Sequence, residues 1–385
     1  MRIVLAPNAF KECLSAPAVA RAMARGVERA APEAETVLIP LADGGDGTVE
    51  ALVSTRGGNF VEITASDPLM RPVHARYGLI DNGKTAVIEM ASASGLWRLQ
   101  DHEKNPLKTT TYGVGEMIRH ALQSGVTTLI VGIGGSATTD GGIGMAAALG
   151  YRLSDAAGRE LPPVGESLSS IVGIDRARVC SELTNAQVLV ACDVTNPLVG
   201  PQGAAPVYGP QKGATPEMVE ALDRGLENLS ARWQETFGLD LREWPGGGAA
   251  GGLGAGLAAF CGAKISSGFD LIADYARLDD ALREADLVLT GEGKIDASTG
   301  FGKVPAGVAQ RAQRFGVPVV ALAGGIMGDM TNLHAAGILA LFSILRRPMS
   351  LSEAIASASE LLSQTTEEVI RLWLVKVGAG GRRSS

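Results

Sequence analysis

The sequence has few of the residues from which zinc sites, disulfide frameworks and hydrolase triads are built. Its 385 residues include only four cysteines and four histidines. No two cysteines form a C-x-x-C pair, the histidines show no metal-ligand spacing, and no G-x-S-x-G nucleophile elbow occurs. These absences argue against a zinc enzyme, a triad hydrolase and a disulfide-stabilised secreted domain. We expect the cysteines to be core thiols in a reducing cytoplasm.

The sequence also lacks any concentration of positive charge. The formal net charge is −7, and no run of lysine and arginine marks a face that could neutralise a phosphodiester backbone. Long hydrophobic runs are missing too, because the one long uncharged segment, residues 245–263, consists mainly of glycine and alanine. The apolar stretch at residues 3–6 is too short for a signal peptide. We therefore expect a cytoplasmic protein that binds neither nucleic acid nor membrane.

Short apolar runs followed by polar tips, and usually by amphipathic helices, recur along the chain. With 46% hydrophobic and 19% charged residues, the chain has the composition of a globular protein. The runs lie at residues 2–6, 37–41, 128–133, 187–192, 286–290, 317–323 and 338–344. Continuous apolar runs that alternate with helices are typical of parallel strands buried on both faces. The sequence therefore predicts an α/β fold.

The arrangement of these runs predicts two domains. The two ends of the chain, residues 1–65 and 285–375, together supply five strands, enough for one flavodoxin-like parallel sheet. Residues 66–284 would form an inserted α/β domain, in which the segment around 60–91 has three runs without a helix and predicts an antiparallel meander. We expect the active site in the cleft between the domains and a disordered tail at 376–385.

The polar tips predict a phosphate site. Ligands of open parallel sheets bind beyond the carboxyl ends of the strands. The tips read APNAFK (6–11), ADGGDGT (42–48), GIGGSATTDGG (132–142), CDVTNP (192–197), TGEGKID (290–296) and AGGIMGD (323–329). Glycine-rich backbone near helix N-termini binds anions, and the carboxylates among these glycines would repel a phosphate unless a divalent cation stood between them. This mixture indicates nucleotide phosphoryl transfer with Mg²⁺.

Two other classes of function remain as alternatives. Gly132, Gly134 and Ala137 match the spacing of a dinucleotide fingerprint, although the helical pattern begins only at Met145. A nicotinamide-dependent oxidoreductase of a small hydroxy acid is therefore the alternative enzyme. A binding protein without turnover is the third possibility. A P-loop is absent, because GEGKID lacks the earlier glycine and has no hydroxyl residue after Lys294.

Taken in order, the segments of this chain resemble the type I glycerate kinases, a bacterial family that phosphorylates D-glycerate with ATP. The segments that carry the resemblance are APNAFKECLSA, PLADGGDGTVEALV, GKTAVIEMASASGL, NPLKTTTYGVGE, GIGGSATTDGG, ACDVTNPLVGPQGAAPVYGPQKGATPEM, GGGAAGGLGAGL, TGEGKID, GKVP and FSI. The resemblance implies a flavodoxin-like domain paired with one described as restriction-enzyme-like. It also implies production of 2-phosphoglycerate in glyoxylate or glycerate catabolism, with ATP and Mg²⁺. We expect a monomer or homodimer.

This chain departs from the family pattern at a few positions. Asn8 and Ala9 stand where Asp-Ser is usual, Thr139 stands where Asn is common, and residues 325–327 replace a Ser-Leu-Gly. Neither a carboxylate nor a hydroxyl at residues 8 and 9 is therefore essential to this copy.

Roles can be assigned to particular residues as hypotheses. Asp193 follows a predicted strand and is our candidate for the residue that deprotonates or orients the attacking hydroxyl, with a turn cap as the alternative. Lys11 is the candidate catalytic cation. The candidates for binding phosphate or nucleotide are Gly134, Gly135, Ser136, Asp140, Gly291, Gly293, Lys294 and Lys303. Those for substrate are Thr195, Asn196 and Lys212, and those for magnesium are Asp43, Glu292 and Asp296.

Overall fold

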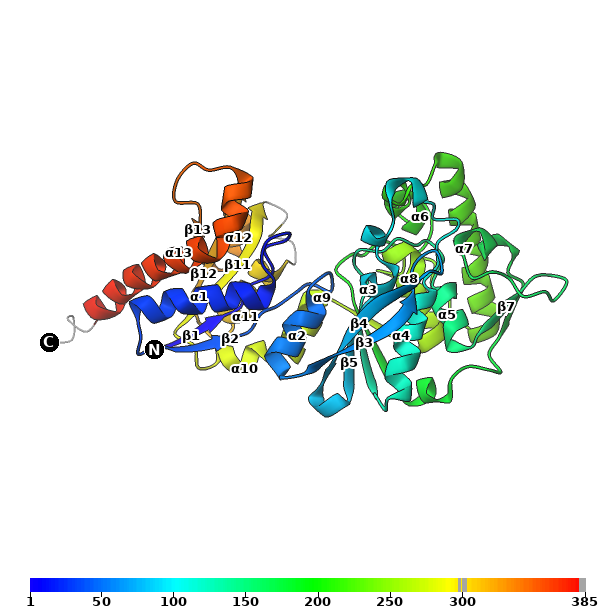
Figure 1. The fold of residues 1–385 in the computed structure, drawn as a ribbon, viewed down its shortest axis with the longest axis horizontal. Coiled ribbons are helices and arrows are strands. Elements are labelled where there is room, and N and C mark those ends of the chain that lie inside the picture. The colour runs from blue at the N-terminus through cyan, green and yellow to red at the C-terminus, as the bar shows by residue number, and fades with distance from the viewer. Residues whose placement is uncertain (297–298, 300–302, 381–385) are drawn as a thin grey trace. The chain divides into compact units, whose positions relative to one another are not determined.

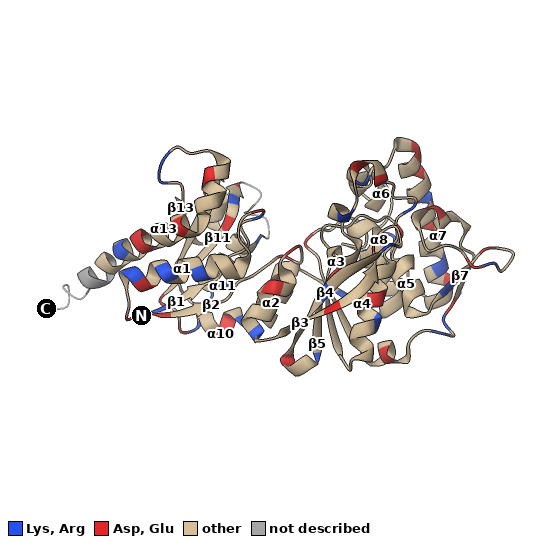
Figure 2. Cartoon of the chain, viewed as in Figure 1, with Lys and Arg blue, Asp and Glu red and all other residues tan. Residues whose placement is uncertain are grey.

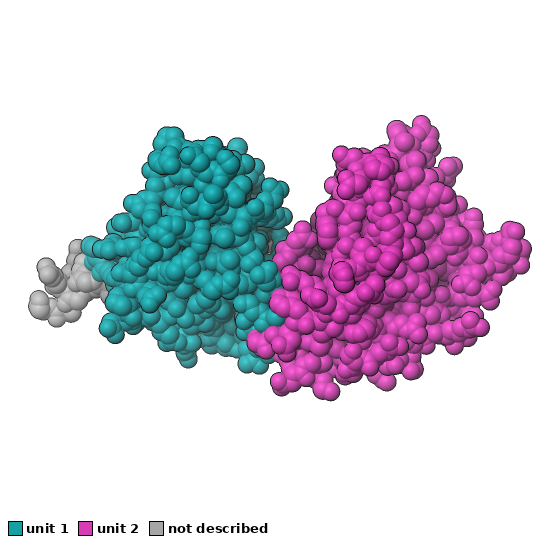
Figure 3. Space-filling view, in the orientation of Figure 1, with its two compact units in different colours: residues 1–43, 50–56, 269–385 teal, residues 44–49, 57–268 magenta. Residues whose placement is uncertain are grey.

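The chain divides into two compact units. The computed structural model describes residues 1–296, 299 and 303–380. Unit 1 comprises Met1–Asp43, Glu50–Arg56 and Phe269–Ser385, and unit 2 comprises Gly44–Val49 and Gly57–Gly268 (Figure 3). The changes at 56/57 and 268/269 lie earlier than the expected boundaries at 65/66 and 284/285. The reason is that the strand at Asn59–Ser66 pairs within unit 2, whereas the helices after residue 268 pack in unit 1.

Unit 1 contains one parallel five-stranded sheet. Its strands are β1 (Arg2–Leu5), β2 (Glu35–Leu38), β11 (Leu287–Asp296), β12 (Val319–Met327) and β13 (Ile338–Ser343), in the order β13-β12-β11-β1-β2 (Figure 1). Each neighbouring pair is parallel. Counted along the chain, the order is 2-1-3-4-5, which is the flavodoxin-like order. The prediction of a parallel α/β sheet built from both ends of the chain is confirmed.

Helices surround this sheet, and two of them pack closely against each other. The helices are α1 (Ala16–Ala30), α2 (Thr48–Arg56), α9 (Gly268–Tyr275), α10 (Leu278–Leu282), α11 (Val304–Gln313), α12 (Thr331–Ala335) and α13 (Leu351–Gly380). Gly26 on α1 allows the contact with α13, since a Cβ there would lie 2.2 Å from the Ser363 carbonyl oxygen. Charges of both signs are interspersed along α1 and α13 (Figure 2), and Arg29 lies 3.0 Å from Glu360.

The end of α13 differs from the expected tail. The helix continues to Gly380, so the first part of the segment that was expected to be disordered, 376–380, is helical. Residues 381–385 lie outside the described residues.

Unit 2 contains a mixed six-stranded sheet. Its strands are β3 (Asn59–Ser66), β4 (Pro72–Ile80), β5 (Thr85–Glu89), β6 (Thr128–Gly132), β9 (Gln187–Ala191) and β10 (Lys264–Ser266), in the order β10-β9-β6-β5-β4-β3. β3, β4 and β5 form the expected antiparallel meander. β5, however, also pairs in parallel with β6, which pairs in parallel with β9, and β9 with β10. The meander therefore joins a parallel half-sheet.

Helices and short elements complete unit 2. The helices are α3 (Ala91–Ser94), α4 (Tyr112–Gln123), α5 (Ile143–Leu149), α6 (Ala204–Tyr208), α7 (Pro216–Phe237) and α8 (Ala249–Cys261), and a small antiparallel pair is formed by β7 (Arg152–Ser154) and β8 (Gly173–Asp175). On α7, Leu222, Leu226, Leu229 and Trp233 are buried, and α8 is a buried helix that lies in the glycine- and alanine-rich segment 245–263. Among the described residues, no helix combines the length and apolar character that crossing a membrane requires.

Two predicted loop tips are strands. β11 continues to Asp296 and β12 to Met327, with Glu292 paired to Ala323 and Lys294 paired to Gly325. From the sequence, these strands were expected to end at residues 290 and 323, because glycine and aspartate are rare in strands. The parallel pairing continues through these glycine and aspartate residues because β11 and β12 both remain extended and lie side by side. The corresponding loop assignments for residues 290–296 and 323–327 were wrong.

Candidate active site

The carboxyl ends of four parallel strands form one edge of the sheet in unit 2. Glu89, Gly132, Ala191 and Ser266 occupy equivalent register positions at the ends of β5, β6, β9 and β10. Chain that leaves these strands therefore emerges along a single edge. The glycine loop that follows β6 and Asp193, which follows β9, both begin there.

Glu89 is a functional candidate that the sequence analysis missed. Its Oε1 accepts a hydrogen bond of 2.8 Å from the backbone N–H of Val49, in the first turn of α2. Burial raises the pKa of Glu89 to about 7, and the nearby charge of Asp46 adds to this increase. The backbone hydrogen bonds from Val49 and Gly47 and the positive charge of Arg76 lower the pKa and so oppose the increase. A group with this pKa is poised for proton transfer at neutral pH.

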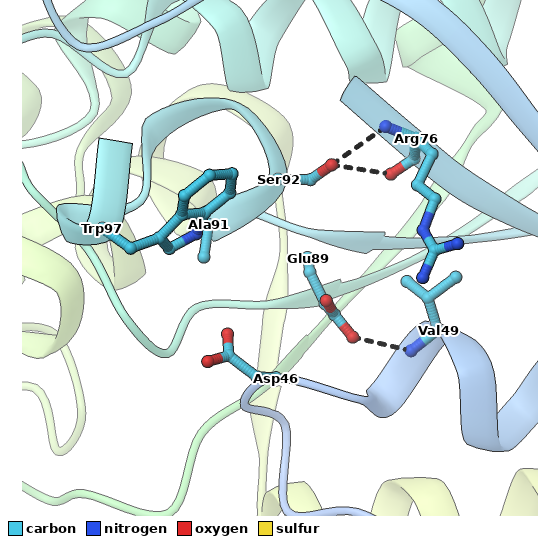
Figure 4. Close-up of a pocket in the computed structure, with 7 residues that line it drawn as sticks. All are labelled: Asp46, Val49, Arg76, Glu89, Ala91, Ser92 and Trp97. Carbon is cyan, nitrogen blue, oxygen red and sulfur yellow. Dashed lines mark hydrogen bonds between the residues drawn. The ribbon is translucent and has the colours of Figure 1, made fainter. Parts of the chain in front are cut away.

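Glu89 lines a cavity of about 230 Å³, which we call the Glu89 pocket. Its lining residues are Asp46, Val49, Arg76, Glu89, Ala91, Ser92 and Trp97 (Figure 4). The Ser92 hydroxyl fixes the backbone of Arg76, because it accepts from the Arg76 N–H at 2.9 Å and donates to the Arg76 carbonyl at 3.0 Å. The Glu89 pocket is therefore lined by the carboxylates of Asp46 and Glu89 and by the guanidinium of Arg76.

The predicted phosphate loop, residues 134–136, adjoins this pocket. Gly134 and Gly135 are exposed, and Gly135 has a φ of +72°, which favours glycine. A Cβ at Gly135 would lie 3.3 Å from the Ala91 Cβ and 3.5 Å from Asp46 Oδ1. The Gly135 carbonyl accepts from the N–H of Leu96 at 2.9 Å, so the loop is joined to the segment that carries Trp97. The side chain of Ser136 is buried.

Asp140, a predicted phosphate ligand, is fully buried and organises the loop instead. Its Oδ2 accepts from the N–H and the hydroxyl of Thr111, both at 2.8 Å, and from the Gly144 N–H at 3.2 Å. Its Oδ1 accepts from the Gly142 N–H at 3.1 Å. Burial raises the pKa of Asp140. Because four protein donors use the carboxylate, contact with a ligand is not its role in this structure.

Lys212, a predicted substrate ligand, is also enclosed. Only 1% of its surface is exposed, and its Nζ donates to the carbonyl oxygen of Thr138 at 2.5 Å. Burial lowers the pKa of Lys212 to about 7, and the charge of Asp140 opposes that shift. This burial could not be predicted from the sequence, since a lysine is usually a surface residue. Lys212 therefore holds the backbone beside the glycine loop rather than facing solvent.

Asp193 and its neighbours lie at the end of β9. Asp193 Oδ1 accepts from the Gly268 N–H at 2.7 Å and from the Ser267 hydroxyl at 3.3 Å, so the carboxylate caps the start of α9. The amide of Asn196 donates to Gln202 at 2.8 Å and accepts from Tyr208 at 2.7 Å. Thr195 is exposed. These contacts show a capping function for Asp193 and a loop-forming function for Asn196.

The carboxyl edge of the sheet in unit 1 gathers the predicted metal ligands and two of the predicted cations. Burial raises the pKa of Glu292 to about 7, and the charges of Lys303, Asp43, Lys11 and Asp296 all act on it. Lys303 Nζ lies 4.0 Å from Glu292 Oε1. Lys294 pairs instead with Asp296 at 3.3 Å. The structure thus brings Lys11, Asp43, Asp296 and Lys303 into electrostatic reach of Glu292.

Glu292 has one oxygen that suits a metal ion. Its Oε2 is buried and has no hydrogen-bond partner within the described part of the chain. Among those residues, no group of three or more acidic, histidine or cysteine side chains forms a closed metal cage. Mg²⁺ needs no such cage, because it prefers one or two carboxylates together with phosphate oxygens and water. The donors present therefore fit Mg²⁺ bound with a phosphate.

The glycines at this edge of the sheet allow neighbouring backbone segments to approach closely. Gly293 lies in β11, where a Cβ would approach the Phe10 Cα to 3.2 Å, so glycine permits the loop that carries Lys11 to pass close by. Gly291 lies in the same strand, next to the carbonyl of Leu322. In the loop after β1, Asn8 is buried and its Oδ1 accepts from the Ala9 N–H at 2.7 Å.

Comparison with known proteins identifies the family. The model of the glycerate kinase family matches residues 3–374. The chain belongs to the glycerate kinase family. A glycerate kinase of Bacillus subtilis is 44% identical over 369 residues, covering 96% of this chain and 97% of that protein. A glycerate 2-kinase of Escherichia coli K12 is 43% identical, with the same coverage.

A solved structure of the same family supports the fold. A crystal structure assigned as a glycerate kinase 2 of Salmonella typhimurium LT2 is 45% identical, covers 99% of both chains and has a TM-score of 0.90. The alternative of a dinucleotide-binding oxidoreductase loses its structural basis, because the loop after Gly132 does not open a helix directly and α5 begins only at Ile143.

Proposed function

We propose that this chain is a glycerate kinase that transfers the γ-phosphoryl group of ATP to the 2-hydroxyl of D-glycerate, giving 2-phosphoglycerate and ADP. The observation that carries the proposal is the end-to-end match to the glycerate kinase family, with relatives named glycerate kinase and glycerate 2-kinase that are matched over nearly their whole length. The reaction would serve catabolism of glyoxylate and glycerate in the cytoplasm.

Phosphoryl transfer requires positioning and charge neutralisation more than covalent chemistry from the protein. In unit 1, Asp43, Glu292 and Asp296 would hold Mg²⁺. The buried Oε2 of Glu292, which has no hydrogen-bond partner among the residues that the structure describes, supports this assignment. When bound, Mg²⁺ would neutralise charge on the phosphate oxygens. Lys11 and Lys303 would contact phosphate oxygens through charge-assisted hydrogen bonds.

In unit 2, the exposed backbone of residues 134–136 would bind a phosphate group. Its support is the exposure of Gly134 and Gly135 and the left-handed backbone at Gly135, which leaves no side chain in front of the amides. Asp193 stays a candidate for orienting the hydroxyl, together with Thr195. The carboxylate of Asp193 also accepts the capping hydrogen bond from the Gly268 N–H through its Oδ1.

A coupled assay tests the proposed function. Purified protein is incubated with ATP, Mg²⁺ and D-glycerate, and ADP release is measured together with conversion of the product by enolase in the absence of phosphoglycerate mutase. Enolase dehydrates 2-phosphoglycerate but not 3-phosphoglycerate, so rapid formation of phosphoenolpyruvate is expected. ADP release that does not depend on glycerate would refute the kinase assignment, and a product inert to enolase would refute the position. Nicotinamide cofactors replace ATP as the control for the oxidoreductase alternative.

A further inference from the structure

We propose that the Glu89 pocket is the glycerate site, in which Arg76 binds the substrate carboxylate and Glu89 accepts the proton of the 2-hydroxyl. The inference rests on the proposed function and assigns the acceptor substrate and the base to particular residues within it. Glu89 would be a catalytic residue and Arg76 a substrate-binding residue.

The size of the Glu89 pocket fits a small acid. Its volume of about 230 Å³ lies below the roughly 300–1,000 Å³ of pockets that enclose drug-sized ligands. A three-carbon hydroxy acid matches this space better than a nucleoside triphosphate does. Four of its seven lining residues are polar or charged, which suits a ligand that carries a carboxylate and two hydroxyls on three carbons.

Arg76 supplies the positive charge that a carboxylate substrate requires. It is the one cationic side chain among the residues that line the pocket. Its backbone is fixed by the two hydrogen bonds with Ser92, and its guanidinium lies 4.7 Å from the centre of the Phe60 ring. A guanidinium held in this way can bind a carboxylate through two parallel hydrogen bonds.

Glu89 is placed to act on a hydroxyl of the same ligand. The carboxylate lies at the end of β5, is anchored by the N–H of Val49, and is drawn between Asp46 and Arg76 in Figure 4. A substrate whose carboxylate meets Arg76 would therefore present its neighbouring hydroxyl towards Glu89. Glu89 has a pKa of about 7, so a substantial fraction is ionised at neutral pH and able to accept a proton.

The position of the glycine loop supports this assignment. Gly135 lies against Ala91 and Asp46, which are both lining residues of the Glu89 pocket. If residues 134–136 bind phosphate, the phosphoryl group and the acceptor hydroxyl are neighbours.

The chemical step balances without a further reactant. The 2-hydroxyl oxygen forms a bond to the γ-phosphorus of ATP, while the bond from that phosphorus to the β,γ-bridging oxygen breaks and ADP leaves with its electron pair. The hydroxyl proton moves to the Glu89 carboxylate and is later released to solvent.

The alternative occupant of the Glu89 pocket is the nucleoside of ATP. It could stack on Trp97, because 66% of the surface of this side chain is exposed.

The test uses the full-length protein and two amide variants of glutamate. Glu89→Gln keeps the acceptor for the Val49 N–H but cannot take a proton, and Glu220→Gln, an exposed residue of α7, is the matched control. We measure kcat, KM for each substrate, the pH–rate profile and the thermal unfolding midpoint. For Glu89→Gln we expect kcat to fall ~10²- to 10⁴-fold. In the wild type the rate should fall as the pH drops below about 7, because Glu89 becomes protonated, and this limb should vanish in the variant. Glu220→Gln should behave as wild type.

Arg76→Gln tests the other half of the proposal. We expect its KM for D-glycerate to rise roughly 10- to 100-fold, since a charge-assisted hydrogen bond is lost, while KM for ATP stays unchanged. If Glu89→Gln fails to fold, the KM values of Arg76→Gln alone decide the pocket's occupant, and an unchanged KM for glycerate overturns the proposal.

Four results would overturn the assignment. Wild-type kcat and pH profile in Glu89→Gln would make Glu89 only a cap of α2. If Arg76→Gln raised the KM for ATP and left the KM for glycerate unchanged, the pocket would be a nucleoside site. A large loss in Asp193→Asn, with Glu89→Gln active, would make Asp193 the base. An unchanged KM for glycerate in a folded Arg76→Gln would remove the carboxylate site. Failure of the proposed function itself is distinct, because the wild type would then not phosphorylate glycerate.

Discussion

Replacing Asp140 by asparagine should destabilise unit 2 by about 3 kcal/mol, although the two side chains have nearly the same shape. An asparagine oxygen in the place of Oδ2 keeps the two bonds from Thr111 and the one from Gly144, but these bonds then involve a neutral acceptor and weaken. The amide nitrogen in the place of Oδ1 would face the Gly142 N–H, so a donor meets a donor and that bond is lost. One lost bond to a charged group is worth about 1.5–3 kcal/mol, and the three weakened bonds add to it.

The measurement is denaturant unfolding followed by tryptophan fluorescence. Trp97, Trp233 and Trp244 lie in unit 2 and only Trp373 lies in unit 1, so the signal reports mainly on unit 2. We expect a lower midpoint with an unchanged dependence on denaturant concentration.

Lys212→Met and the double variant Asp140→Asn/Lys212→Met complete a double-mutant cycle. The double variant should lose less free energy of unfolding than the two single variants lose together, because the side chains of Asp140 and Lys212 interact. A stability of Asp140→Asn within about 0.5 kcal/mol of wild type would refute the organising role of the carboxylate.

Four further outcomes follow from the same structure. Gly135→Val should lower kcat far more than the unfolding midpoint, because a β-branched residue at a φ of +72° strains only an exposed loop; unchanged turnover would remove the loop from the site. Glu292→Gln should raise the Mg²⁺ concentration needed for half-maximal rate, and excess Mg²⁺ should partly restore turnover; an identical titration would exclude Glu292 as a ligand. The unfolded chain binds more protons at Lys212 than the folded chain between about pH 7 and 10, so Lys212 makes stability rise with pH in that window, and Lys212→Met should flatten the rise. Asp193→Asn should keep wild-type stability, since asparagine still accepts from Gly268, and a loss of midpoint would contradict the capping geometry.

The parallel sheet of unit 1 could be predicted because buried parallel strands leave a strong local signal. Runs such as RIVLA and VPVVALA are continuous and apolar, and each is bounded by turn residues. The extension of β11 and β12 could not be predicted, because the strand GEGKID is stabilised by its pairing with residues 323–327 and not by its own side chains.

The candidate site was only partly predictable. The convergence of Lys11, Asp43 and Glu292 follows from the rule that ligands bind at the carboxyl ends of parallel strands. The inward orientation of Asp140 depends on two hydrogen bonds from Thr111, a residue 29 positions earlier in the chain that the local sequence around Asp140 cannot reveal. Glu89 could have been found if β5 had been recognised as parallel to β6 as well as antiparallel to β4.

The path of the chain between the two units has a consequence for synthesis on the ribosome. The chain changes unit four times, and β1 pairs with a strand made much later, Ile3 with Leu287. At about 5–20 residues per second, β1 would wait roughly 15 to 60 seconds for β11 to emerge. Residues 57–268 have no such delay, since the whole sheet of unit 2 is contained in them. The edge of β1 that pairs with β11 is thus exposed for most of translation, even when β1 has already paired with β2. A chain interrupted before residue 287 leaves that edge unpaired, a species that chaperones would have to hold.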